Sequence, residues 1–281
     1  MQRALIIGCG YTGVALVKKL QARGISVSAT SLTGGHLDGL HLGQADLYRP
    51  ETLNFEGADH SVVYYLVSTL TRQYDDRNKT HLRPLEAALT ALDRHSISGL
   101  IYLSSTSVYG DQHGGWVDEQ TPAAPSSPWG QMRLDLERRV SAYGAQRGLP
   151  ACIVRSPEIY GPRRGPVARL QEGYALRYPR RYTNRIHVED LSEVLAVLGE
   201  RLDQELLLAS DGNPAIAEEV YQYAALLLGM AEVPRSQQEI QDPNRLGLAR
   251  DSKRCRNDKL LDWLGQPLKY PSFKEGLPHT L

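Results

Sequence analysis

The sequence has few cysteines, no net charge and no long apolar run, and each of these absences excludes a class of protein. Its three cysteines, Cys9, Cys152 and Cys255, are far apart, which disfavours a disulfide scaffold and favours a reducing compartment such as the cytoplasm. Basic and acidic residues balance at 32 each, which disfavours a general nucleic-acid or membrane-surface binder. No apolar run approaches the roughly 18 residues that a membrane span needs, so no membrane association is expected.

Short β-rich runs alternate with helical patterns in the first part of the chain. The run "ALIIG" at residues 4–8 is interpreted as a buried strand rather than a signal peptide, and residues 11–24 and about 77–95 have helical periodicity. Further strands are expected at residues 25–30, 61–67, 100–105 and 151–155. This alternation predicts βαβ units and an α/β fold with a Rossmann-type, doubly wound parallel sheet.

The pattern becomes mixed after residue 162. "ELLLAS" at residues 205–210 reads as a late strand that can return to the sheet, and residues 217–229 form an amphipathic helical pattern. We therefore expect a dinucleotide-binding domain at residues 1–162 and a smaller, mixed substrate-binding lobe at residues 163–281.

A glycine-rich loop joins the first predicted strand to the first predicted helix. "GCGYTG" places Gly8, Gly10 and Gly13 in G-x-G-x-x-G spacing, which permits a tight turn, close approach of a pyrophosphate and close packing of helix on strand. The alternative is a tight turn without a ligand. The position between strand and helix favours dinucleotide binding.

The acidic residue that usually binds the ribose 2′-hydroxyl of NAD is missing. The second predicted strand ends in Thr30 and Ser31, which offer hydroxyl groups and no charge. A 2′-phosphate would meet no repulsion there, so the sequence favours NADP over NAD. The alternative is that both residues only form a loop.

Six segments make the chain resemble the extended short-chain dehydrogenase/reductase family, specifically its NAD-dependent epimerase/dehydratase group. They are "GCGYTG", "ADL" at 45–47, "LSSTSVYGD" at 103–111, "EIYGP" at 158–162, "RIHVEDL" at 185–191 and "YPSFKEGL" at 270–277. The resemblance implies that Asp46 and Leu47 lie beside the adenine and that Ser105 hydrogen-bonds the reacting oxygen. It also implies that His187 and Asp190 are structural residues.

The chain departs from this family at its acid–base pair, a tyrosine and a lysine four residues apart. Ser127 and Pro128 begin the corresponding helix as N-cap and first residue, which places Trp129 and Arg133 at the two positions. Tryptophan has no proton to transfer near neutral pH, and arginine stays protonated. An alignment slip is the alternative, yet no Tyr-x-x-x-Lys occurs nearby. Arg133 is expected to keep the ribose-binding half of the lysine's role.

Glu158 is the main candidate for a substitute acid or base. It stands two residues before Tyr160, where the resemblance places a substrate-facing asparagine, and a carboxyl group there could transfer a proton. The alternative is a glutamate paired with a nearby arginine. Lesser candidates are Tyr65, Tyr109 and His113.

The segment from residue 155 to 185 is strongly basic. It holds two acidic residues and eight arginines, at positions 155, 163, 164, 169, 177, 180, 181 and 185, which suits a phosphate or carboxylate ligand. A solvated surface is the alternative. Single-stranded nucleic acid is a weaker one, since Tyr174, Tyr178 and Tyr182 are interleaved.

The sequence thus predicts an NAD(P)-dependent oxidoreductase or epimerase that acts on a small anionic substrate and needs no metal. The alternative is a non-catalytic NAD(P)-binding sensor or partner protein, and a homodimer is left open. The expected cofactor-binding residues are Gly8, Gly10, Tyr11, Thr12, Gly13, Thr30, Ser31, Asp46, Leu47, Ser105 and Arg133.

Overall fold

The computed structural model describes the whole chain except residues 38, 69–81, 239, 242–245 and 247–248. The chain divides into two compact units, between which it passes several times. The first unit comprises Met1–Ser104, Met132–Val154 and Ser192–Leu206, and the second comprises Ser105–Gln131, Arg155–Leu191 and Leu207–Leu281. The single boundary at residue 162 stays a prediction.

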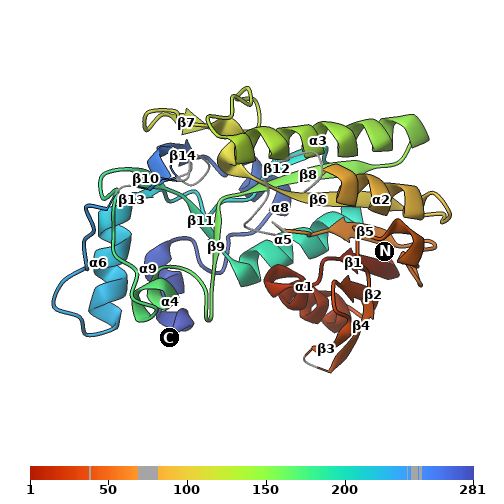
Figure 1. Cartoon of the computed structure of the whole chain (residues 1–281), viewed down its shortest axis with the longest axis horizontal. Coiled ribbons are helices and arrows are strands. Elements are labelled where there is room, and N and C mark those ends of the chain that lie inside the picture. Colours follow the sequence, from red (N-terminus) through yellow and green to blue (C-terminus); the bar gives the residue numbers. More distant parts are fainter. Residues whose placement is uncertain (38, 69–81, 239, 242–245, 247–248) are drawn as a thin grey trace. The chain divides into compact units, whose positions relative to one another are not determined.

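An eight-stranded sheet holds most of the strands (Figure 1). Its order is β12-β8-β6-β5-β1-β2-β4-β3. β1 pairs in parallel with β2 and β5, as do β5 with β6 and β2 with β4, which confirms the predicted Rossmann-type sheet. Only the short edge strand β3 is antiparallel to its neighbour among the pairings described here. The strands are β1 (Arg3–Ile7), β2 (Ser26–Ser31), β3 (Gly35–Leu37), β4 (Leu40–Gln44), β5 (Val62–Tyr65), β6 (Gly99–Ser105), β8 (Ala151–Ser156) and β12 (Leu206–Leu208).

The sheet forms because its central strands are apolar on both sides. All four residues of β5 are buried, as are four of the five residues of β1, and such continuous burial is typical of parallel strands covered by helices. The helices that pack in the first unit are α1 (Tyr11–Ala22), α2 (Arg83–Leu92), most of α3 (Pro128–Arg147) and most of α5 (Val188–Arg201), with the short helix η1 at Pro50–Thr52.

Helices α2 and α3 lie side by side (Figure 1). Arg139 of α3 forms an ion pair with Glu86 of α2, and Arg147 forms one with Asp93, which directly follows α2. α3 begins at Pro128 as predicted, because the Ser127 hydroxyl accepts the backbone N–H of Gly130 at 3.1 Å. None of the helices in the described ranges is both long and apolar enough to cross a membrane.

The second unit is built from short elements around its own apolar core. That core includes Tyr160, Val167, Leu176 and Val220. The elements are η3 (Thr106–Tyr109), β7 (Trp116–Val117), β9 (Glu158–Tyr160), α4 (Pro166–Gln171), β10 (Tyr182–Thr183), β11 (Arg185–His187), β13 (Ala215–Ile216), α6 (Ala217–Leu227), β14 (Arg254–Cys255), α8 (Asp258–Leu264), α9 (Phe273–Gly276) and η4 (Leu277–Thr280).

His187 and Asp190 hold the C-terminal segment of the second unit in place. The Asp190 carboxylate accepts the backbone N–H groups of Lys269 at 2.7 Å and Tyr270 at 2.9 Å. The His187 ring is buried between Tyr160 and Tyr270, with centroid distances of 5.1 and 4.0 Å. These contacts fit the structural role that the resemblance implied for both residues.

Candidate functional site

In the loop between β1 and α1, a Cβ atom would have different surroundings at each of the three glycines. Gly8 has a φ of +87°, and a Cβ atom there would lie 2.8 Å from a methyl group of Val67. A Cβ atom on Gly13 would lie 3.1 Å from the sulfur of Cys9, so this glycine lets α1 approach β1. Among the described residues, apart from its chain neighbours and the backbone of α1 itself, none has an atom within 4 Å of such a Cβ position at Gly10. The space beside Gly10 is therefore open to a ligand.

The N-terminus of α1 offers a place for an anion. Gly10 is its N-cap residue, and it makes no side-chain cap hydrogen bond. The first turn, which starts with Tyr11 and Thr12, contains no acidic residue. The positive end of a 12-residue helix therefore meets the open space beside Gly10, an arrangement that fits a dinucleotide pyrophosphate.

A pocket lies in the first unit, at the ends of β1, β2 and β5. Five of the predicted cofactor-binding residues line it: Gly8, Thr30, Ser31, Asp46 and Leu47. The rest of the lining was not predicted, and it consists of Ile7, Leu32, Ala45, Tyr48 and Val67.

Leu32 and Tyr48 are the most informative of the unpredicted residues. They are 53% and 42% exposed, which is unusual for large apolar side chains at a pocket. Each directly follows a predicted pair, Thr30–Ser31 or Asp46–Leu47, so proximity in sequence was the signal that could have identified them. Exposed apolar walls of this kind suit a flat, weakly polar group such as a purine.

The polar groups of the pocket differ in what they can offer a ligand. The Thr30 hydroxyl donates to the carbonyl of Ile6 at 3.5 Å and is buried in the sheet. The Ser31 hydroxyl accepts the N–H of Gly34 at 3.0 Å and still has its own proton to donate. The Asp46 carboxylate accepts the N–H of Tyr48 at 3.0 Å. Ser31 is therefore better placed than Thr30 to bind a ribose.

Arg133 of α3 acts on two buried tyrosines of the first unit. Tyr65 and Tyr102 are directly opposite each other on β5 and β6, with ring centroids 6.0 Å apart. Burial raises the pKa of both hydroxyls, and the positive charge of Arg133 offsets this only in part. Tyr65, a lesser acid–base candidate, therefore stays protonated at neutral pH and is 3% exposed.

Glu137 is a buried carboxylate that the sequence analysis did not single out. It lies one helical turn after Arg133 on α3, is 5% exposed, and accepts a hydrogen bond from Ser104 at 2.5 Å. Its charge also raises the pKa of Tyr102, so Arg133 and Glu137 both lie close to that hydroxyl. The spacing of four from Arg133 was the available signal.

Ser105 and Trp129 belong to the second unit. The Ser105 hydroxyl accepts the N–H of Ser107 at 3.2 Å and caps η3, and the side chain is half-buried. Trp129 lies in the first turn of α3 and is also half-buried. A Cβ atom on Gly130 would lie 2.6 Å from the carbonyl oxygen of Ser107, so α3 starts directly against η3.

Tyr109 and His113 have settings that disfavour a role in proton transfer. Tyr109 donates its hydroxyl proton to the carbonyl of Asp118 at 2.7 Å, and burial raises its pKa to about 12. Its ring also lies 4.8 Å from the guanidinium carbon of Arg155. His113 is exposed and lies 3.2 Å from the carboxylate of Asp111.

Glu158 forms an ion pair in the second unit, at 2.5 Å from Arg169. The structure thus shows the arginine-paired arrangement that was the alternative to a free acid. Arg169 also donates to the hydroxyl of Tyr221 at 3.1 Å, and Tyr221 stacks on Tyr174 with centroids 5.1 Å apart. The guanidinium of Arg181 lies near enough to interact with Glu158. Burial lowers the pKa of Arg181, and the charge of Glu158 opposes this. We call these five residues the Glu158 cluster.

The Glu158 cluster carries more positive than negative charge. Two guanidinium groups, Arg169 and Arg181, share one carboxylate, and the tyrosines add hydroxyl groups without charge. The negative charge of Glu158 is the main reason that the pKa of Arg169 is raised. One more anionic group would balance the cluster.

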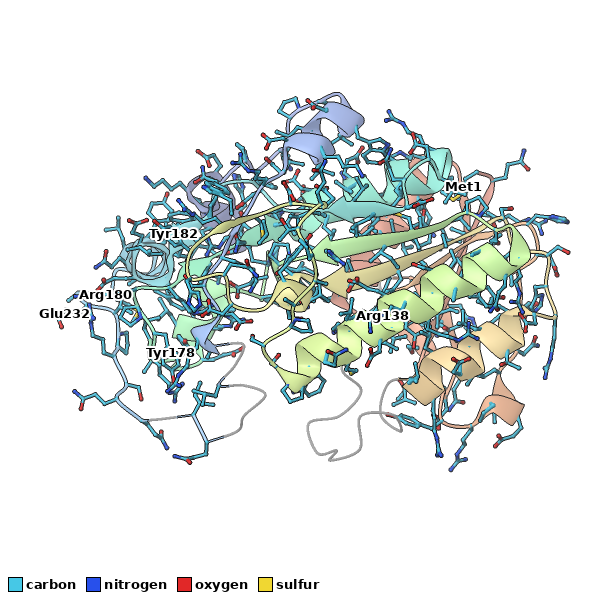
Figure 2. All side chains as sticks on the ribbon, turned by 90° about the horizontal axis from the view of Figure 1, so that it is seen from above. Met1, Arg138, Tyr178, Arg180, Tyr182 and Glu232 are labelled. Carbon is cyan, nitrogen blue, oxygen red and sulfur yellow. The ribbon has the colours of Figure 1, made fainter. Side chains whose placement is uncertain are left out.

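The other arginines of the basic segment are spread over different environments. Arg155 and Arg185 are buried, and Arg185 lies over the ring of Phe273. Arg177 donates to the carbonyl of Gln238. Figure 2 shows Arg180 at the surface between Tyr178 and Tyr182. The six surplus charges therefore do not form a single patch.

The chain contains one Tyr-x-x-x-Lys spacing, Tyr270 to Lys274, and it does not rebuild the missing pair. Helix α9 begins only at Phe273, so the two residues are not stacked on one helical face. Tyr270 is buried against His187. In the described ranges no three His, Cys, Asp or Glu side chains are grouped to hold a metal ion.

Known proteins resemble this chain over most of its length. Protein YeeZ of Escherichia coli K12 is 28% identical over 206 residues, which cover 70% of this chain and 73% of YeeZ. The uncharacterized UDP-glucose epimerase YtcB of Bacillus subtilis is 36% identical over 86 residues, which cover 31% of this chain and only 27% of YtcB. The UDP-glucose 4-epimerase of Thermus thermophilus, solved in complex with NAD, superposes with a TM-score of 0.83 at 23% identity, covering 99% of this chain and 97% of that one.

The model of the NAD dependent epimerase/dehydratase family matches residues 4–205. That range includes the glycine loop, the pocket beside it, α3 and the Glu158 cluster apart from Tyr221. The chain belongs to the NAD dependent epimerase/dehydratase family.

Proposed function

We propose that this chain is an NAD(P)-dependent oxidoreductase or epimerase that acts on a small anionic substrate. The observation that carries the proposal is the open space beside Gly10, at the uncapped N-terminus of α1 and in a chain of this family. A nicotinamide cofactor bound there would supply hydride transfer. Gly8, Gly10, Gly13, Tyr11 and Thr12 would hold its pyrophosphate.

The pocket beside the loop would take the adenosine half of the cofactor. Leu32 and Tyr48 would cover the adenine, Ser31 would donate to the ribose, and Asp46 and Leu47 would close the pocket wall. The lack of an acidic side chain at Thr30 and Ser31 is compatible with a 2′-phosphate, so a preference for NADP stays a prediction. Arg133 would bind the ribose next to the nicotinamide.

The Glu158 cluster would bind the anionic substrate. Its surplus positive charge and its two stacked tyrosines suit a carboxylate or phosphate attached to a small planar or apolar body. The substrate anion would take over the ion pair with Arg169. Glu158, released from that pair, would exchange a proton with the substrate in place of the missing tyrosine, and Ser105 would donate a hydrogen bond to the reacting oxygen.

A second candidate is a non-catalytic NAD(P)-binding protein, and the pair Trp129 and Arg133 favours it. Neither residue can transfer a proton at neutral pH. The two functions separate when NADH and NADPH are first titrated by fluorescence. The protein is then incubated with a panel of small carboxylates, phosphates and sugar nucleotides while nicotinamide absorbance is followed, with product analysis for redox-neutral epimerisation.

Turnover of an anionic member of this panel supports the enzyme, and loss of that turnover in Glu158→Gln supports the assigned base. Tight dinucleotide binding with no turnover of any member supports the sensor. Absence of dinucleotide binding contradicts both functions.

A further inference from the structure

A β-hairpin at the edge of the sheet carries two histidines directly opposite each other. β3 and β4 lie at this edge of the sheet (Figure 1) and pair antiparallel, with His36 opposite His41 and Leu37 opposite Leu40. Residues directly opposite each other on antiparallel strands have Cβ atoms about 4.5–5.5 Å apart, so the side chains of His36 and His41 come close together.

The two imidazole rings have the separation that a shared metal ion requires. Their centroids are 5.2 Å apart with an interplanar angle of 72°, and both side chains are exposed. With metal–nitrogen bonds of about 2.0–2.1 Å and tetrahedral geometry, the centroids of two bound imidazoles lie about 5 Å apart. The hairpin therefore holds the two rings at the separation that two ligands of one metal ion would have.

We propose that His36 and His41 bind one late transition-metal ion, such as Zn²⁺, Ni²⁺ or Cu²⁺. Imidazole nitrogen suits these ions, whereas Mg²⁺ and Ca²⁺ prefer oxygen ligands. No group of three or more His, Cys, Asp or Glu ligands occurs in the described ranges, so water completes the coordination shell and the ion exchanges with solvent. This site is independent of the proposed function.

The bound metal would hold β3 and β4 together next to the pocket that Ser31 lines. Gly34, which precedes β3, donates its N–H to the Ser31 hydroxyl, so the hairpin starts where the pocket wall ends.

The test is a calorimetric titration of metal-free, untagged protein with ZnCl₂ and NiCl₂ at pH 7.5, and with MgCl₂ as a control ion. We expect one equivalent of Zn²⁺ or Ni²⁺ and no Mg²⁺ binding. His36→Ala and His41→Ala should each weaken binding at least about tenfold, because loss of a residue that only hydrogen-bonds a metal ligand already has an effect of that size.

The matched control is His113→Ala, because His113 is also an exposed histidine but belongs to the second unit. Its variant should bind the metal like the unaltered protein. Circular dichroism checks that all variants fold. The proposal is overturned if the unaltered protein binds neither ion, if either hairpin variant binds normally, or if His113→Ala causes an equal loss.

Discussion

Replacing Arg133 by alanine should weaken cofactor binding without unfolding the protein. Arg133 is half-buried on α3, and its charge acts on the hydroxyl groups of Tyr65 and Tyr102. A hydrogen bond from a charged donor to the ribose contributes about 1.5–3 kcal/mol, part of which water regains in the truncated variant. We therefore expect a loss of about 1–2 kcal/mol, which is roughly a 5- to 30-fold increase in Kd.

The assay is a fluorescence titration with NADH and NADPH, combined with thermal unfolding. Arg138→Ala is the matched control, because Arg138 lies on the same helix (Figure 2), is mostly exposed and pairs only weakly with Asp135 at 3.3 Å. Arg133→Lys should restore part of the affinity, since the positive charge is kept. Normal cofactor binding by Arg133→Ala in a folded protein would refute the placement of this residue at the ribose.

Three further predictions concern proton transfer and pH. If the protein turns over a substrate, Glu158→Gln should remove the activity while leaving the Kd for the cofactor within about twofold, which is below about 0.5 kcal/mol; a variant with full activity would exclude Glu158 as the base. Trp129→Phe should leave activity nearly intact because the aromatic wall remains, and a loss as large as that of Glu158→Gln would mean that the indole itself is needed. Burial lowers the pKa of His187 from 6.5 to about 4, so below pH 6.5 the unfolded chain takes up a proton that the folded chain does not. Stability should thus decline by up to about 3 kcal/mol as the pH falls from 6.5 to 4, as measured by urea unfolding, and a His187→Gln variant with the same decline would contradict this.

The central fold could be predicted because its signals are local. A short continuous apolar run such as "ALIIG" is typical of a strand in a sheet that is covered on both faces. Ser127–Pro128 marks a helix start because the serine hydroxyl accepts a backbone N–H of the first turn. The glycine loop was equally clear because its G-x-G-x-x-G spacing is a local pattern, although the contact that requires Gly8, with Val67, comes from a distant part of the sequence.

The hairpin of β3 and β4 was not predicted, because its residues are exposed and lack the alternation of apolar and polar residues that identifies a strand. Its strands form by pairing with each other and with β2. The walls of the pocket were missed for a similar reason. Leu32 and Tyr48 each directly follow a predicted pair, but no residue pattern separates an exposed apolar side chain at a pocket from one in an ordinary loop.

The ion-pair and hydrogen-bond partners of the charged residues could not be predicted from the sequence either. An excess of arginine near Glu158 suggested pairing, but only the fold selects Arg169 and Arg181 and buries Arg155 and Arg185 elsewhere. Glu137 was missed because nothing in the helix pattern separates a buried carboxylate from an exposed one. Its hydrogen-bond partner Ser104 lies on β6, which is distant from Glu137 in the sequence.

The central claim is that a nicotinamide dinucleotide binds across the loop between β1 and α1, and a titration of the unaltered protein and Gly10→Val with NADH and NADPH tests it most directly. A side chain at position 10 would meet no described atom beyond its chain neighbours and the backbone of α1, and thermal unfolding of both proteins checks that the variant folds. We expect saturable binding of at least one dinucleotide by the unaltered protein and none by Gly10→Val, because the valine fills the space that the phosphates need. Equal affinity of both proteins, or no binding by the unaltered protein, would contradict the account.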